Sequence, residues 1–140
     1  MANGAIIDGQ ITASTEWDPV THGAKLGRLF SMPGSGGWVA GTNNVNQWIQ
    51  IDLLLQHKVT RVATQGRSIH CCQWIAKYNL QHRADGVNFQ YYKEQGQTIN
   101  KVKTQSSITK LNRAPLIAVV FMIVKICALI RMISRAISSG

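Results

Sequence analysis

The stretch QWIQIDL at residues 47–53 alternates apolar and polar side chains, and this alternation decides the fold class. In an extended chain the apolar positions 49, 51 and 53 share one face, while the polar positions 50 and 52 share the other. This period of two is typical of a half-buried β-strand. The stretch therefore predicts that the surrounding domain is built from strands.

Short strand-like segments lie on both sides of this stretch and alternate with turn-forming residues. They cover residues 11–13, 59–64, 74–81 and 89–92. Residues 14–46 form a long connection rich in Gly, Pro and Asn, and Ala84-Asp85-Gly86 has the composition of a hairpin turn. Short strands at this spacing predict a β-sandwich or barrel. The aromatic residues expected in its core are Trp38, Trp48, Trp74, Tyr78 and Phe89.

Composition limits the function classes. The 140 residues are 45% hydrophobic, enough for one domain with a real core. Residues 1–100 contain nearly balanced charges, whereas residues 101–140 contain Lys and Arg but no Asp or Glu. A basic chain can favour anionic lipid or sulfated glycan, but the charges do not form a run with interleaved aromatic residues, so we expect no nucleic-acid partner.

Catalytic and metal-binding motifs are missing from the sequence. The three cysteines, at positions 71, 72 and 127, form neither a disulfide framework nor a metal-ligand spacing. We find no nucleophile elbow and no glycine-rich loop for phosphate. We therefore expect a protein that is not an enzyme and that uses no cofactor and no metal.

The segment 114–133 is strongly apolar and is interrupted only by Lys125 and Arg131. It could form two buried strands, it could be an aberrant end of the reading frame, or it could be one membrane helix of about twenty residues. A lysine near the centre of a membrane span costs about 2.5–3.5 kcal/mol on insertion scales. We therefore place buried strands first, the aberrant end second and the membrane span third.

Several motifs of residues 1–102 resemble the discoidin family, also called the coagulation factor five/eight type C domains. They are QITAS with Glu16-Trp17, residues 37–53, VATQGR at 62–67, residues 74–81 and residues 85–89, in the order of the family. The resemblance implies an all-β, discoidin-like jelly-roll β-sandwich (a distorted barrel), with residues 1–140 as a single domain. Residues 103–140 diverge, because Val119-Val120-Phe121-Met122 replaces the family's R-Y-[IV]-R.

The resemblance also implies a non-enzymatic adhesion module that belongs to a larger multidomain protein and acts outside the cell or at its surface. Its partners would be an anionic phospholipid membrane, a glycan or an extracellular matrix protein, bound through loops at one end of the sandwich. The first residues contain no secretory signal. The alternative is an incomplete or membrane-tethered product whose apolar C-terminal segment anchors or destabilises it.

Carried over by motif, the ligand contacts lie in a first loop (residues 17–22), a second loop (residues 43–46) and a third loop (residues 67–72). The candidates are Trp17, Asp18, Val20 and His22 in the first loop, Asn44 and Val45 in the second, and Arg67, Ser68, Ile69 and His70 in the third. Trp17 suits an interface because an indole is apolar with one donor, but it could equally cap the core. Arg67 could pair with an anion or with a backbone carbonyl.

Overall fold

A computed structural model describes residues 5–66, 75, 77–83, 88–94, 97–98, 100–102, 106–110, 116–119 and 122–126. Strands dominate this part of the chain, together with the short 3-10 helices η1 (Asp8–Gln10) and η2 (Ala24–Leu26). The strands are β1 (Ile11–Ala13), β2 (Trp48–Ile51), β3 (Gln56–Val59), β4 (Arg61–Gln65), β5 (Lys77–His82), β6 (Gln90–Tyr91), β7 (Lys93–Glu94), β8 (Gln97–Thr98), β9 (Asn100–Val102), β10 (Ser106–Lys110), β11 (Leu116–Val119) and β12 (Met122–Ile126). The predicted all-β class is confirmed.

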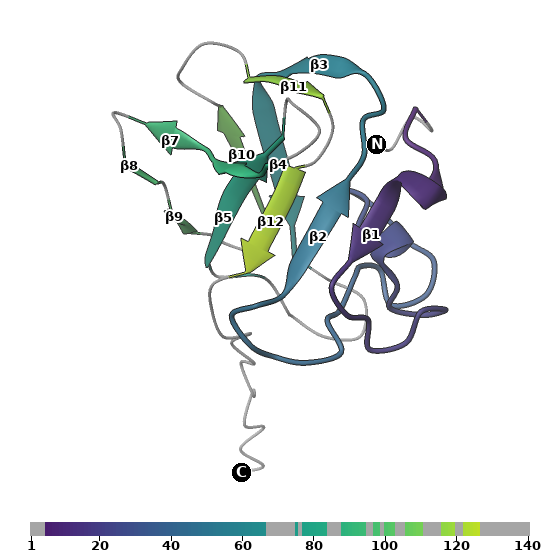
Figure 1. Cartoon of the computed structure of the whole chain (residues 1–140). Coiled ribbons are helices and arrows are strands. Elements are labelled where there is room, and N and C mark those ends of the chain that lie inside the picture. Colours follow the sequence, from purple (N-terminus) through teal and green to yellow (C-terminus); the bar gives the residue numbers. More distant parts are fainter. Residues whose placement is uncertain are drawn as a thin grey trace.

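The largest sheet is antiparallel and has six strands (Figure 1). Its order is β1-β2-β12-β5-β6, and β9 also pairs with β5. Three two-stranded sheets accompany it: β10 with β4, β11 with β3, and β7 with β8. The described strands form no closed barrel, and their arrangement agrees with the predicted all-β sandwich.

The apolar C-terminal segment supplies the central strand of this sheet. Strand β12 pairs with β2 on one side and with β5 on the other. In this register Val124 lies opposite Ile49 and Leu80. The expectation of two strands in the segment is therefore confirmed for the backbone of β11 and β12. Among the described residues, no helix is both long enough and apolar enough to cross a bilayer.

The core forms where the alternating faces of the strands meet. Its buried apolar residues are Ile11, Ala24, Leu26, Ile51, Val62, Tyr78, Leu80 and Tyr92. Tyr78 is only 1% exposed, which confirms its predicted place, and Tyr92 is a buried aromatic residue that the sequence did not single out. Trp38, Trp48 and Phe89, also predicted as core residues, are only half-buried and so differ from Tyr78.

The polar partners of Trp38 and the register of Trp48 explain their exposure. The indole Nε1–H of Trp38 donates to the Thr15 carbonyl at 2.9 Å, so this ring packs at the base of the loops rather than inside the sheet. Trp48 occupies the face of β2 opposite the buried Ile51, since the two are three positions apart in a strand. Trp74, also predicted as core, lies outside the described residues.

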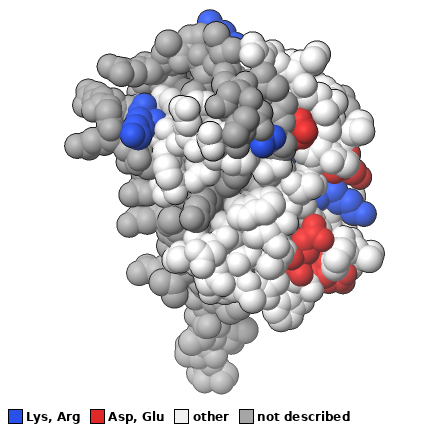
Figure 2. Space-filling model, viewed as in Figure 1, with Lys and Arg blue, Asp and Glu red and all other residues white. Residues whose placement is uncertain are grey.

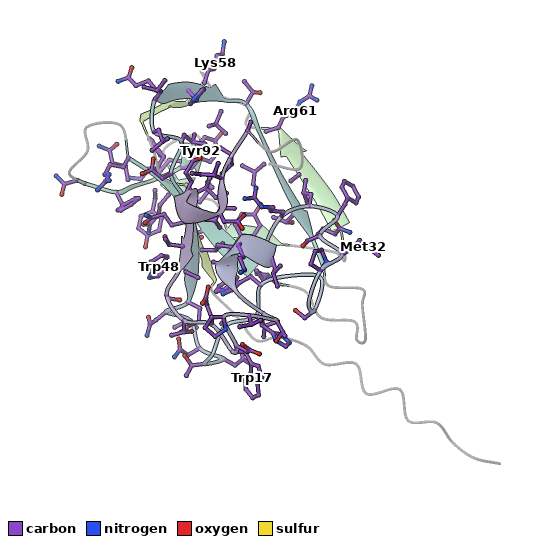
Figure 3. The ribbon with its side chains drawn as sticks, turned by 90° about the vertical axis from the view of Figure 1, so that its right-hand side faces the viewer. Trp17, Met32, Trp48, Lys58, Arg61 and Tyr92 are labelled. Atoms are coloured by element: carbon purple, nitrogen blue, oxygen red, sulfur yellow. The ribbon has the colours of Figure 1, made fainter. Side chains whose placement is uncertain are left out.

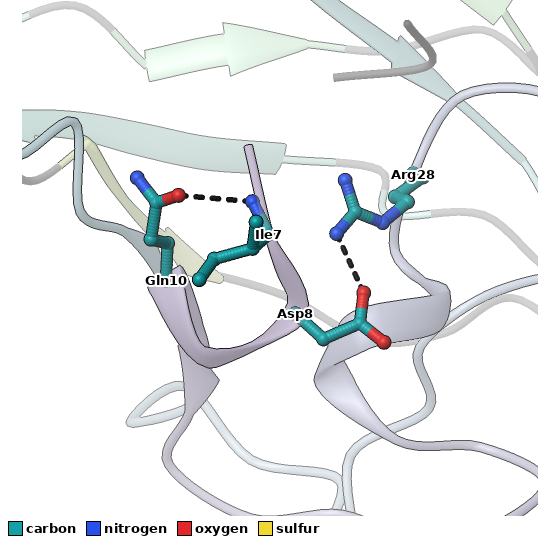
Figure 4. Close-up of polar contacts among 4 residues, drawn as sticks. All are labelled: Ile7, Asp8, Gln10 and Arg28. Carbon is teal, nitrogen blue, oxygen red and sulfur yellow. Dashed lines mark hydrogen bonds and ion pairs between the residues drawn. The ribbon is translucent and has the colours of Figure 1, made fainter. Parts of the chain in front are cut away.

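The N-terminal segment is held by hydrogen bonds and by an ion pair, and Figure 4 shows two of these contacts, Ile7 with Gln10 and Asp8 with Arg28. The buried Gln10 accepts from the Ile7 N–H at 2.9 Å through Oε1, and it donates from Nε2 to the Asp52 carbonyl at 2.5 Å. Asp8 forms an ion pair of 2.6 Å with Arg28. The long connection 14–46 joins β1 to β2 at the other end of these strands, where the first and second loops lie (Figure 1).

Candidate binding loops

The first loop presents two apolar side chains to solvent. Trp17 is 69% exposed and Val20 is 75% exposed. Figure 3 shows Trp17 at the tip of the molecule, directed away from the ribbon. The structure thus decides between the two interpretations of Trp17 left open by the sequence: the indole does not cap the core.

Asp18 organises the turn that presents Val20. Its carboxylate accepts from the Val20 N–H at 2.9 Å and from the Thr21 hydroxyl at 2.7 Å. The Thr21 hydroxyl, followed by the Val20 amide, holds the pKa of Asp18 below its ordinary value. The His22 N–H donates to the Asp18 carbonyl at 2.7 Å. Asp18 and His22, predicted as ligand contacts, are therefore also parts of the loop's own hydrogen-bond network.

The first loop is pinned to the segment around residues 34–39. The Trp17 N–H donates to the Val39 carbonyl at 2.9 Å, and the Val39 N–H donates to the His22 carbonyl at 3.1 Å. Behind the loop, the Glu16 carboxylate accepts from the Ala24 N–H at 2.6 Å. A Cβ at Gly23 would collide with the Pro19 carbonyl oxygen. These contacts fix the loop backbone, so its exposed side chains sit on a rigid support.

The second loop has one exposed apolar side chain, Val45, which is 55% exposed. The Asn44 Oδ1 accepts from the Asn46 N–H at 2.9 Å, which closes a short turn around Val45. The same oxygen accepts from the side chain of Gln47. Asn44, predicted as a ligand contact, is therefore the residue that shapes this turn.

Gln47 lies between the two loops, and sequence reasoning did not single it out. It is 5% exposed and its amide contacts residues from the bases of both loops. In the sequence it is one polar residue at the start of an alternating strand, which gives no sign of burial. The candidate residues of the third loop lie outside the described part of the chain, in the gap between residues 66 and 75; they are Arg67, Ser68, Ile69 and His70.

The described part of this end of the molecule has no excess of positive charge. Residues 16–26 contain Glu16, Asp18 and a single cation, Lys25. Lys58 and Arg61 lie at the opposite end from Trp17 (Figure 3). Acidic groups are also visible on the lower right of the face shown in Figure 2. Within the described residues, no three His, Cys, Asp or Glu side chains form a possible metal site.

The comparisons with known proteins decide the family. The family model described as F5/8 type C domain matches residues 10–128. The chain belongs to the F5/8 type C domain family. This match confirms the resemblance found in the motifs, and it continues past residue 102 through β12 of this F5/8 type C domain.

Relatives of this F5/8 type C chain include lactadherin of Rattus norvegicus, which is 39% identical over 102 residues, covering 69% of this chain and 24% of the relative. Coagulation factor V of Mus musculus is 33% identical over 119 residues, covering 79% of this chain and 5% of the relative. The chain therefore spans a quarter or less of these curated relatives.

Among solved structures, discoidin II of Dictyostelium discoideum superposes with a TM-score of 0.71 at 26% identity, covering 89% of this chain and 50% of that chain. The family 32 CBM from C. perfringens NanJ, solved in complex with galactose, has a TM-score of 0.59 at 18% identity and covers 92% of this chain and 88% of that chain. The second likeness shows the shared fold alone. Together, family and fold support a binding module.

Proposed function

We propose that this F5/8 type C domain binds a phospholipid membrane surface through the loops at one end of its sandwich. Three exposed apolar side chains, Trp17, Val20 and Val45, carry this proposal, because they stand on hydrogen-bonded loops at the same end. Exposed apolar groups gathered in this way usually mark an interaction site. An indole suits the headgroup level of a bilayer in particular, where one edge stays hydrated.

The rigidity of the loops favours this mode of binding. A flexible loop must be ordered on binding, and that ordering reduces affinity. Here the backbone of the first loop is already fixed by hydrogen bonds to Val39 and by the carboxylate of Asp18. Insertion of Trp17 and Val20 therefore transfers apolar area from water into the membrane without first ordering their backbone.

The described loops carry too little positive charge to attract an anionic membrane, so in our proposal they bind mainly by inserting apolar side chains. Glu16 and Asp18 oppose an anionic surface, and Lys25 offsets only one of them. In our proposal a preference for anionic lipid comes from the third loop, where Arg67 pairs with a phosphate or carboxylate, Ser68 and His70 add polar contacts, and Ile69 adds an apolar one. The domain acts by binding alone, as a module of a larger extracellular or cell-surface protein.

Vesicle co-sedimentation of the whole chain tests this function. We expect the chain to pellet with phosphatidylcholine vesicles, and more strongly when they contain phosphatidylserine. The double change Val20→Asp with Val45→Asp should leave it in the supernatant, since charged tips resist insertion. The matched control is Leu55→Asp, which alters an apolar residue that is 70% exposed in the turn after β2, away from the loops.

Two results would overturn the membrane proposal. One is a wild-type chain that stays in the supernatant with every vesicle. The other is an equal loss of binding with the control at Leu55. Selective release of the chain from vesicles by a soluble galactoside or another glycan would instead assign these loops to a sugar ligand.

A further inference from the structure

A buried glutamine joins the first two binding loops. We propose that Gln47 is a positioning residue, which holds the first and second loops at a fixed spacing so that they meet a surface as one unit. The effect of Gln47 on membrane binding rests on the proposed function. The connection between the two loops rests only on the hydrogen bonds of the Gln47 side chain. Gln47 is 5% exposed, so its polar atoms must find partners within the protein.

The oxygen of Gln47 faces the base of the first loop. Oε1 accepts from the Ser14 hydroxyl at 2.7 Å and from the Thr15 hydroxyl. These residues directly precede Glu16 and Trp17 in the sequence. The Thr15 hydroxyl in turn accepts from the Gly41 N–H at 3.0 Å. The Gln47 oxygen therefore anchors the chain segment that leads into Trp17.

The nitrogen of Gln47 faces the second loop. Nε2 donates to the Thr42 hydroxyl at 3.0 Å and to the Asn44 Oδ1 at 2.9 Å. Asn44 is also the acceptor that closes the turn around Val45. The two protons of the amide are therefore both used on the segment that presents Val45.

Only a primary amide makes this connection. It offers an acceptor at one end and two donor protons at the other, whereas an ionised carboxylate only accepts and a methionine thioether is a weak acceptor that cannot donate. The first loop is backed by Val39 and the second loop by its own turn, and Gln47 links the two. If the link is lost, both loops lose their shared buried anchor and loosen, and the Thr15–Gly41 bond is left as the direct contact between their bases. Two tips held at a fixed spacing insert together and bind more strongly than two that insert separately.

Amide hydrogen exchange tests whether Gln47 couples the two loops, and it needs no ligand. The Trp17 N–H, bonded to Val39, reports the first loop, and the Asn46 N–H, bonded to Asn44, reports the second. The Tyr92 N–H, bonded to the Leu80 carbonyl at 2.8 Å, reports the core. In Gln47→Met we expect exchange to rise tenfold or more at Trp17 and Asn46 and to stay within about twofold at Tyr92.

The control for this test is Gln50→Met, the same substitution three positions further along the chain in β2, which should leave all three amides unchanged. A rise at only one loop, or at neither, would refute the coupling. A uniform rise that includes Tyr92 would assign Gln47 a general role in stability and would also overturn the proposal.

Gln47→Glu gives the functional test. At pH 7 the introduced carboxylate cannot donate to Thr42 or Asn44, and we expect vesicle binding to fall tenfold or more. Burial raises the pKa of such a carboxyl, and its protonated form donates one hydrogen bond, so binding should recover in part at pH 5. Binding that stays low at pH 5 or never falls at pH 7 contradicts the proposal. If the wild type binds no vesicles at all, the membrane function fails, while the exchange experiment still decides the coupling.

Discussion

Replacing Trp17 with alanine is expected to weaken vesicle binding about thirtyfold while leaving the fold intact. The size of the effect follows from exposure. A tryptophan offers up to about 250 Å² of surface, and Trp17 is 69% exposed, so about 170 Å² is available for transfer into a membrane. At about 25 cal/mol per Å² full burial would contribute about 4 kcal/mol.

Insertion at headgroup level buries only part of this area. If half is buried, the contribution is about 2 kcal/mol, which corresponds to about thirtyfold in affinity because each 1.4 kcal/mol or so is tenfold. The same exposure predicts that Trp17→Ala changes the free energy of unfolding by less than about 0.5 kcal/mol, as for other surface substitutions. Stability and binding are therefore expected to separate in this variant.

The assay is titration of the wild type, Trp17→Ala and Met32→Ala with vesicles of phosphatidylcholine and phosphatidylserine, alongside thermal unfolding of each. Met32 is the matched control, because it is apolar and 73% exposed but lies well away from Trp17 (Figure 3). Equal affinity for Trp17→Ala and the wild type would refute the reasoning. An equal loss of affinity with Met32→Ala would also refute it, because the contribution to binding would then not be specific to the position of Trp17.

Three further outcomes follow. The hydrogen bonds to Asp18 hold its folded-state pKa below the ordinary value of 3.8, so they persist above that pH and are lost as the pH falls through the folded pKa. Binding to phosphatidylcholine vesicles should therefore stay constant at every pH well above 3.8 and decline only below it. Gly23→Ala should lower stability by about 1–3 kcal/mol in thermal unfolding, because its Cβ meets the Pro19 carbonyl, whereas Gly9→Ala has open space and should not. Truncation after residue 115 removes β12 from between β2 and β5, so cooperative unfolding should disappear in circular dichroism; a retained sharp transition would contradict the sheet order.

Alternation along the strands was the part of the fold that the sequence predicted best. The period-two pattern of residues 47–53 places Ile49, Ile51 and Leu53 on one face, and of these Ile51 is buried while the other two are half-buried. Tyr78, predicted as a core residue, is also buried. The error at Trp48 came from giving the size of an aromatic ring more weight than its position. Its place in the same alternation, out of phase with Ile51, already puts it on the less buried face.

Long-range pairing was beyond the reach of local patterns. The apolar run around Val124 was compatible with strands or with a membrane helix, because an apolar sequence does not show which segment of the chain it packs or pairs with. Its place between β2 and β5 depends on partners that lie from 42 positions (Ile123 with Gln81) to 77 positions (Lys125 with Trp48) earlier in the chain. The buried amides of Gln10 and Gln47 were missed for the same reason, since each has a partner more than thirty positions away in the sequence, Asp52 for Gln10 and Ser14 for Gln47.

The candidate loops were predicted in part. The motifs located Trp17, Val20 and Val45, and the structure adds that these three are exposed. The hydrogen bonds of Asp18 and Asn44 to their own loops could not be predicted from residue type. A short polar side chain in a loop can bind a ligand or the neighbouring backbone equally well.

Quenching of tryptophan fluorescence by brominated phospholipid tests the membrane proposal most directly. Quenching by bromine needs near contact, so an indole inside the bilayer is quenched and one that stays in the protein is not. Trp17→Phe keeps an apolar ring at the tip and should still bind. We predict strong quenching of the wild type with brominated vesicles, and loss of most of it in Trp17→Phe at equal bound protein. Equal quenching in the two proteins, or none in the bound wild type, would contradict insertion of the first loop.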